Sequence, residues 1–305
     1  MEHLERRLSR ALLVHVPELK KRDDAPRDDE DCRGEAEEGF EIHGQGPYGV
    51  PGFLPIIRKY SRSHAAAIVE WAGFLFVNIG AQPSRFAEEW APMRERVARF
   101  DLPNLVVGHR VVYDVRSNWK LVFQNYSECL HCPVIHPELA SVLPYQSGAN
   151  DLTEGPFLGG YMEILAPNES ATMSGRSCGR PVNPSAPPSD ARRAYYYSLM
   201  PNLLLSLQPD YVNYYLVQPV APDRTRVESE WLFHPDTLRD PASNIRDAIE
   251  FWDVTNRQDW DIVERSQLGV GSRRYAPGPY SPRESIPAAW DREYLRMMGR
   301  NSGTP

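Results

Sequence analysis

Cysteine is scarce in this chain of 305 residues, and long apolar runs are missing. Its four cysteines, Cys32, Cys129, Cys132 and Cys178, are too few for a disulfide scaffold of this size, so we expect reduced thiols. No apolar run approaches the roughly 20 residues of a transmembrane helix. The first 19 residues also lack the apolar core of a secretory signal. The sequence therefore predicts a soluble, cytoplasmic protein.

A net positive charge is absent as well. The formal net charge of −7 argues against nucleic acid or an anionic membrane as the main partner. The sequence shows no heptads and no periodicity of the solenoid kind. What it does contain is 41% hydrophobic residues, which suffices for the core of one large domain or of two small ones.

The first 46 residues differ in composition from the rest. Within them, Lys20 to Glu38 is dense in charge and nearly free of large apolar residues, which predicts a disordered or loosely held segment. Ile68 to Ile79, by contrast, has the β-branched and aromatic content of two paired strands, with a turn at Ala72-Gly73.

Helix and strand are both expected in the next segment. Pro83 to Arg99 is rich in Glu, Arg and Ala and favours a helix, with a break or restart at Pro92. Val106 to Val115 predicts a strand. It ends at Ser117-Asn118, a good N-cap pair for the helix that follows.

That helix has two chemically distinct sides. Its apolar stripe at helical spacing consists of Trp119, Val122, Phe123, Tyr126 and Leu130. Its opposite side carries Gln124, Asn125, Glu128 and His131. A surface helix would normally carry Lys and Glu there, so the polar side is a candidate functional surface.

The second half of the chain predicts strands followed by a long helix. Tyr195 to Phe233 indicates three strand segments (YYYSLM, LLLSLQ with DYVNYYLVQPV, and RVESEWLF), separated by turns rich in Pro, Asn and Asp. A long helix is expected next, with Pro241 in its first turn and its end near Gln267. A short helix around Trp290 to Met298 follows a Pro- and Ser-rich stretch.

The long helix places a carboxylate among apolar residues. The residues that share this face are Ile245, Ile249, Trp252, Asn256, Asp259 and Val263. An unpaired buried carboxylate is costly, so it normally has a cation or a metal beside it. Taken alone, an ordinary Asp–Arg pair or a small rotation that exposes Asp259 is the simpler explanation.

Two histidines favour the metal. His131 and His136 are separated by four residues, across a proline. Two imidazoles and a distant carboxylate form the 2-His-1-carboxylate set of non-haem Fe(II) oxygenases, which leaves positions free for O2 and substrate. Glu128 lies within reach of His131 and could fix its tautomer. The pair alone is weak evidence, and Glu128 alone would be read as a solvated helix residue.

Cys129 and Cys132 raise a zinc alternative, because C-x-x-C beside histidines is a zinc pattern. No second C-x-x-C or H-x3-H follows, and Cys178 is isolated. Since the two cysteines flank His131, we expect that all three side chains cannot easily turn toward one ion. Iron is therefore the preferred interpretation, and a zinc-binding structural protein is an alternative.

These segments resemble the α-subunit catalytic domain of Rieske non-haem iron ring-hydroxylating oxygenases. Asn118 to Leu139 (NWKLVFQNYSECLHCPVIHPEL) is similar to that family's histidine signature. Gln258 to Gly269 (QDWDIVERSQLG) is similar to the helix that bears its third ligand. The matched positions occur in the right order over Val69 to Met298.

The resemblance implies roles for individual residues. His131, His136 and Asp259 match the ligands of a mononuclear Fe(II). Glu128 matches the acidic residue that connects the cluster of one subunit to the iron of its neighbour. Most members have Asp at that position, and Glu occurs in relatives that act on trimethylammonium compounds.

The resemblance also implies a fold and an activity. The fold is α+β, of the helix-grip (START-like) type, with an antiparallel sheet and a long C-terminal helix over an iron cavity. The activity is O2-dependent hydroxylation or oxidative demethylation of a small organic substrate. In the family, a reductase or ferredoxin supplies electrons, and the subunits form a homo-oligomer, typically a trimer.

The [2Fe–2S] cluster of this family needs a C-x-H and a C-x2-H pair. Before the matched strands the sole cysteine is Cys32, the next histidine is His43, and neither spacing occurs. We therefore predict no [2Fe–2S] ligands in this chain. Residues 1–63 are expected to be a truncated or degenerate remnant of a Rieske domain, and residues 64–305 the catalytic domain.

The substrate is predicted only as a class, aromatic or quaternary ammonium. The candidate cavity residues are Asn125, Tyr211, Tyr214, Tyr215, Trp252 and Trp260. The aromatic ones serve equally well as ordinary core. We thus predict oxygenation at Fe(II), impaired by the missing cluster, and the alternative is a non-catalytic ligand-binding protein of the same fold.

Overall fold

The computed structural model describes residues 11–15, 67–78 and 86–300, and the chain divides into two compact units, residues 1–89 and 90–305. The charged segment Lys20–Glu38 lies outside the described residues, as does most of the predicted remnant at 1–63. Within the described parts, no helix is both long and apolar enough to cross a bilayer.

The first unit contains a three-stranded antiparallel sheet in the order β1-β3-β2. Its elements are β1 (Ala11–His15), β2 (Ala67–Trp71), β3 (Phe74–Asn78) and α2 (Phe86–Glu89). The predicted strand pair is confirmed. Ala72 and Gly73 connect the two strands with φ of 55° and 86°, as the twist of a tight hairpin turn requires.

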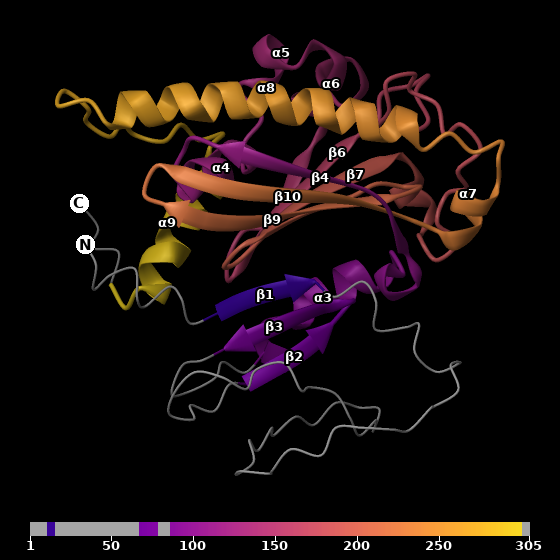
Figure 1. Ribbon diagram of the computed structural model, residues 1–305, viewed down its shortest axis with the longest axis horizontal. Coiled ribbons are helices and arrows are strands. Elements are labelled where there is room, and N and C mark those ends of the chain that lie inside the picture. Colours follow the sequence, from indigo (N-terminus) through magenta and orange to yellow (C-terminus); the bar gives the residue numbers. More distant parts are fainter. Residues whose placement is uncertain (1–10, 16–66, 79–85, 301–305) are drawn as a thin grey trace, which may run out of the picture. The chain divides into compact units, whose positions relative to one another are not determined.

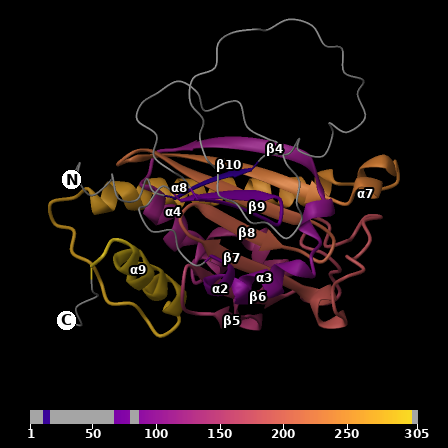
Figure 2. The same cartoon turned by 90° about the horizontal axis from the view of Figure 1, so that it is seen from below.

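The second unit is built on a seven-stranded antiparallel sheet in the order β4-β10-β9-β8-β7-β6-β5 (Figure 2). The strands are β4 (Val106–Val115), β5 (Ala149–Leu152), β6 (Phe157–Glu163), β7 (Arg193–Leu199), β8 (Leu203–Leu207), β9 (Val212–Ala221) and β10 (Arg224–Phe233). Tyr195 to Phe233 thus holds four strands, not three. The predicted middle segment breaks after Leu207, where the Gln208 N–H donates to the Tyr211 carbonyl and closes a turn.

Helices surround this sheet (Figure 1). They are α3 (Ala91–Ala98), α4 (Trp119–Tyr126), α5 (Cys132–Ile135), α6 (Pro137–Val142), α7 (Pro235–Arg239), α8 (Arg246–Val270) and α9 (Ser285–Met297), with short 3-10 turns η1 (Leu102–Asn104), η2 (Tyr145–Ser147) and η3 (Pro188–Arg192). The long helix α8 crosses one face of the sheet, and α4 contacts both α8 and β9. The predicted α+β architecture, an antiparallel sheet under a long helix, is confirmed.

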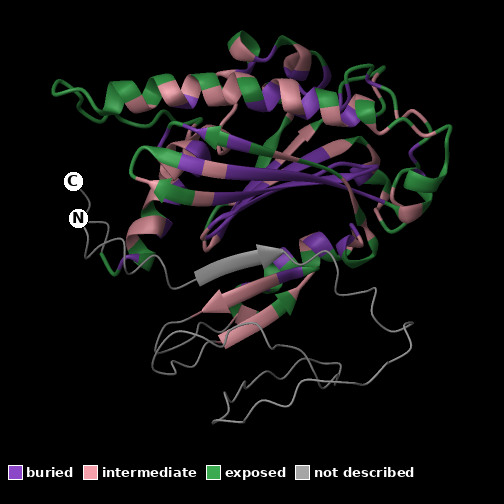
Figure 3. Ribbon diagram, viewed as in Figure 1, coloured by how far each residue is buried: buried purple, intermediate pink, exposed green. Residues whose placement is uncertain are grey.

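The core lies between α8 and the sheet, where the buried residues of the central strands gather (Figure 3). One cluster joins Phe123 of α4 to Trp290 of α9, and a second joins Trp231 of β10 to Phe251 and Trp252 of α8. Burying a large apolar side chain contributes about 1.5–3 kcal/mol, so these two clusters hold α8 against the strands.

Two predicted helix boundaries are wrong for local reasons. The Asn118 side chain caps α4 as expected, but α4 ends at Tyr126, because the Ser127 hydroxyl donates to the Phe123 carbonyl at 2.6 Å. Leu130 is therefore exposed and leaves the apolar stripe. Helix α8 begins at Arg246, not near Pro241, and just before it the Asn244 side chain accepts the Arg246 N–H in a local turn.

Candidate metal centre and substrate cavity

Two prolines shape the segment that carries the histidines. Pro133 lies in the first turn of α5 and Pro137 in the first turn of α6, where a missing N–H costs nothing. His131 precedes α5, and His136 stands between the two short helices. The chain therefore turns sharply twice, and the imidazole ring centroids lie 5.2 Å apart.

Both imidazoles face one carboxylate oxygen on α8. His136 Nε2 lies 3.0 Å and His131 Nε2 3.3 Å from Asp259 Oδ1. The His136 side chain is 1% exposed and that of Asp259 is 16% exposed. The structure thus brings the three sequence-predicted ligands together at one buried point, although the histidines and the carboxylate come from distant segments.

The outer nitrogens of both rings are already occupied. His131 Nδ1 lies 2.7 Å from Glu128 Oε1, and His136 Nδ1 lies 2.7 Å from Gln258 Oε1. Both partners are acceptors, so each Nδ1 carries a proton and each Nε2 is the ring atom that faces Asp259. Two Nε2 atoms and a carboxylate that converge need a proton or a metal cation between them, and the donor set left after loss of the proton suits Fe(II).

The charges at the centre support this reading. Burial lowers the pKa of His131, but hydrogen bonds to Asp259 and Glu128 outweigh burial and raise it to about 9. Burial raises the pKa of Asp259, yet hydrogen bonds to the two imidazoles hold it below the usual range. The carboxylate is therefore ionised and ready to bind a cation.

Gln258 is a site residue that the sequence interpretation missed. Its carboxamide oxygen holds His136, and its nitrogen lies 3.5 Å from Glu138 Oε2. Its position beside Asp259 was the available signal. Asn125, predicted as a substrate residue, lines the cavity and also donates from Nδ2 to Asp259 Oδ1 at 2.6 Å.

The expected reduced state of the cysteines is wrong for two of them. Cys129 and Cys132 form a disulfide, since the turn between them sets their Cα atoms 5.0 Å apart, within the disulfide range. Cys178 is free. Cys132 Sγ lies 3.9 Å from His131 Nε2, so one cysteine does approach the imidazoles. Ligating atoms of His131, Cys132 and His136 all lie within 4.8 Å of one another.

A cavity of about 430 Å³ opens beside the candidate metal centre. Three aromatic rings on its wall follow one another, with Tyr126 and Tyr196 centroids 6.3 Å apart and Tyr196 and Trp252 centroids 6.1 Å apart. Gly159 of β6 also lines it. An added Cβ there would lie 1.8 Å from the Tyr196 carbonyl oxygen, so only glycine lets these strands approach.

The catalytic-domain family model of the ring-hydroxylating oxygenase α subunit matches residues 102–300. The chain belongs to this family. The match includes β4, α4 to α6, the sheet and α8, and so the whole candidate metal centre. The Rieske-type resemblance of the sequence is thereby confirmed.

Relatives of known activity are similar over much of the chain. The glycine betaine monooxygenase oxygenase subunit of Chromohalobacter salexigens is 27% identical over 246 residues, 70% of this chain and 54% of that protein. The carnitine monooxygenase oxygenase subunit of Acinetobacter baumannii is 33% identical over 75 residues, 24% of this chain and 20% of that protein. The chain spans about half the length of the glycine betaine relatives it matches.

Solved structures of such enzymes share the fold. The quaternary ammonium Rieske monooxygenase CntA in complex with L-carnitine matches with a TM-score of 0.58 and 19% identity. The match covers 76% of this chain and 60% of that one. At this identity the likeness concerns the fold: the sheet with its long helix is that of a Rieske oxygenase catalytic domain.

The remaining predicted substrate residues of this oxygenase domain lie in different places. Trp252 lines the cavity. Tyr211 lies behind it in the core, where its hydroxyl accepts the Trp252 Nε1–H at 2.6 Å and donates to the Ala171 carbonyl. Trp260 and Tyr215 border a small cavity of about 20 Å³ that also reaches Asp259. Tyr214 is buried and hydrogen-bonded to Glu230.

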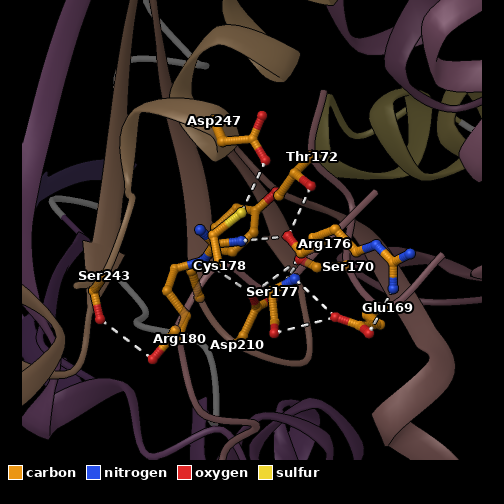
Figure 4. Close-up of polar contacts among 12 residues, drawn as sticks. Glu169, Ser170, Thr172, Arg176, Ser177, Cys178, Arg180, Asp210, Ser243 and Asp247 are labelled. Atoms are coloured by element: carbon orange, nitrogen blue, oxygen red, sulfur yellow. Dashed lines mark hydrogen bonds and ion pairs between the residues drawn. The ribbon is translucent and has the colours of Figure 1, made fainter. Parts of the chain in front are cut away.

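A buried ion pair supports the wall behind Trp252. Arg180 Nε donates to Asp210 Oδ2 at 2.9 Å, and the Ser170 hydroxyl donates to Asp210 Oδ1 at 2.8 Å (Figure 4). Both charged side chains are fully buried, and Asp210 directly precedes Tyr211. Breaking such a pair costs about 3–5 kcal/mol, so this network fixes the loop against which Tyr211 and Trp252 rest.

Proposed function

We propose that this chain is an oxygenase catalytic domain that binds mononuclear Fe(II) through His131, His136 and Asp259 and oxygenates a small substrate in the adjoining cavity. The observation that carries the proposal is the convergence of both Nε2 atoms on Asp259 Oδ1 beside that cavity. Bound Fe(II) would supply the activation of O2, with open positions left by the three ligands.

The surrounding residues prepare this site. Glu128 and Gln258 hold the Nδ1 protons and so keep both Nε2 atoms directed inward. Asn125 orients the Asp259 carboxylate through its 2.6 Å hydrogen bond. The burial of His136 keeps water from competing for its nitrogen. Each of these features reduces how far the three side chains must move when an ion binds.

The proposed substrate class is a quaternary ammonium compound that also bears a carboxylate. The rings of Tyr126, Tyr196 and Trp252 offer π faces to a trimethylammonium group. Among the described residues that line the cavity, Arg283 carries a positive charge. Its Nη1 donates to the Tyr145 hydroxyl at 3.2 Å. It could bind a carboxylate. Similar proteins are named for glycine betaine and carnitine, which carry both groups.

The electron source is the second part of the proposal. In this interpretation, residues 1–63 are a truncated or degenerate Rieske remnant, because the C-x-H and C-x2-H pairs are not found there. A reductase or ferredoxin, and trimeric assembly, are proposed by analogy with the family.

Hydrogen peroxide tests the chemistry without that cluster, since it supplies oxygen and electrons together. The full chain, loaded anaerobically with Fe(II), would be mixed with glycine betaine and peroxide. Removal of one N-methyl group consumes one peroxide and gives formaldehyde, water and the dimethylammonium product. Formaldehyde from the wild type but not from Asp259→Ala supports the proposal. Tight substrate binding without product in either protein would favour the non-catalytic alternative.

A further inference from the structure

The disulfide of this chain encloses a proposed metal ligand. Cys129 and Cys132 are joined across His131, and both line the cavity. Cys132 Sγ lies 3.9 Å from His131 Nε2, the same nitrogen that faces Asp259. A disulfide sulfur is a poor metal donor, whereas a thiolate is a strong one. The oxidation state of the two cysteines therefore decides how many metal-donor atoms surround the proposed metal centre.

We propose that Cys129 and Cys132 are a reversible dithiol–disulfide couple that changes the donor set of the metal centre. With the disulfide closed, the centre offers two imidazole nitrogens and one carboxylate oxygen. With it open, the Cys132 thiolate adds a sulfur to this set. The proposal rests on the proposed metal centre and concerns which divalent ion that centre prefers.

The two sulfurs have unequal access, which gives the exchange a direction. Cys129 is partly exposed, whereas Cys132 is 3% exposed. An external thiolate attacks Cys129 Sγ, the bond to Cys132 breaks, and Cys132 leaves as a thiolate inside the site. A second thiol then releases Cys129 and forms the external disulfide. In total, the protein disulfide and two small thiols give the protein dithiol and one small disulfide.

The change alters the chemistry of the site in two ways. A thiolate is a soft ligand that favours Zn²⁺ over Fe²⁺ when added to imidazoles. A fourth protein ligand also occupies a position that a three-ligand site leaves open. The ligating atoms of His131, Cys132 and His136, all within 4.8 Å of one another, are close enough to share one ion.

The test compares the full-length chain in its two states and two single variants. Wild type is either oxidised with glutathione disulfide or reduced with a phosphine that is then removed, and mass confirms each state. Co²⁺ binding is followed by the near-ultraviolet thiolate-to-cobalt band, and Zn²⁺ affinity by competition. We expect the band only after reduction, with Zn²⁺ bound at least tenfold more tightly, or about 1.4 kcal/mol.

The variants separate the two sulfurs. Cys129→Ser keeps the Cys132 thiol and should show the cobalt band whatever the oxidant. Cys132→Ser should show no band and no response to reductant. Equal spectra and Zn²⁺ affinities in all four samples would overturn the inference while leaving the proposed centre intact. Loss of the centre itself would appear instead as Co²⁺ binding that is unaffected by His136→Ala.

Discussion

Gln258 Oε1 lies 2.7 Å from His136 Nδ1 and fixes which nitrogen of that imidazole faces Asp259. The acceptor holds a proton on Nδ1, so Nε2, 3.0 Å from Asp259 Oδ1, is the ring atom available for a cation. Gln258 and Asp259 are adjacent on α8. One turn of this helix therefore supplies both a proposed metal ligand and the group that orients a second ligand.

Removal of the Gln258 carboxamide should weaken metal binding without abolishing it. Loss of a group that orients a ligand typically costs about 10–100-fold in affinity. We expect a loss of that size in Gln258→Ala and recovery of most of it in Gln258→Glu, which keeps an acceptor oxygen. Anaerobic Co²⁺ titration measures both. An unchanged affinity in Gln258→Ala would show that His136 needs no such support.

Glu128→Gln should have a modest effect. In the wild type, His131 Nδ1 lies 2.7 Å from Glu128 Oε1. The variant keeps the side-chain size and an acceptor for this nitrogen but removes the charge. We expect somewhat weaker iron binding and little change in peroxide-driven product formation. Complete loss of product with iron still bound would instead indicate that Glu128 takes a direct part in the reaction.

Metal binding should release a proton near neutral pH. The pKa of His131 is raised to about 9, because its bonds to Asp259 and Glu128 outweigh the effect of burial. Below that pH the ion must displace a proton from the ring, so affinity rises with pH and levels off above about 9. Calorimetry near pH 7 in buffers of different ionisation enthalpy should give about one proton released per ion. An affinity independent of pH from about 7 to 9 would contradict this.

The aromatic ring of Tyr196 should contribute to ligand binding at the cavity wall. Tyr196→Leu should weaken binding of glycine betaine several-fold, whereas Tyr196→Phe should not, because phenylalanine keeps the ring face for a cation–π contact worth about 0.5–2 kcal/mol. Tryptophan fluorescence can report binding, since Trp252 lies on the same wall. Equal affinities in the two variants would mean that the ring does not contact the ammonium group.

The sequence predicted which residues would lie together better than it predicted what surrounds them, and particular residues explain why. Helical spacing alone placed Asp259 on the face of α8 that packs against the core, and in the structure Asp261, two residues on, instead pairs with Arg265 at 2.7 Å on the exposed side. The role of Gln258 depends on a histidine 122 positions away, which no local pattern encodes. Tyr211 is aromatic, as a residue of such a cavity would be, but the turn before β9 directs it into the core.

Loss of one carboxylate should be decisive, while loss of its neighbour should not. Asp259→Ala removes one of three proposed ligands and should abolish iron binding, as should His131→Ala and His136→Ala. Asp261→Ala is the matched control, because its side chain is 57% exposed on the same helix.

The most direct measurement is metal and sulfide analysis after anaerobic Fe(II) loading of the wild type, Asp259→Ala and Asp261→Ala. The account predicts about one iron per chain and no acid-labile sulfide in the wild type and in Asp261→Ala, and no iron in Asp259→Ala. Visible bands of an iron–sulfur cluster, stoichiometric zinc in place of iron, or equal losses in the two variants would contradict it.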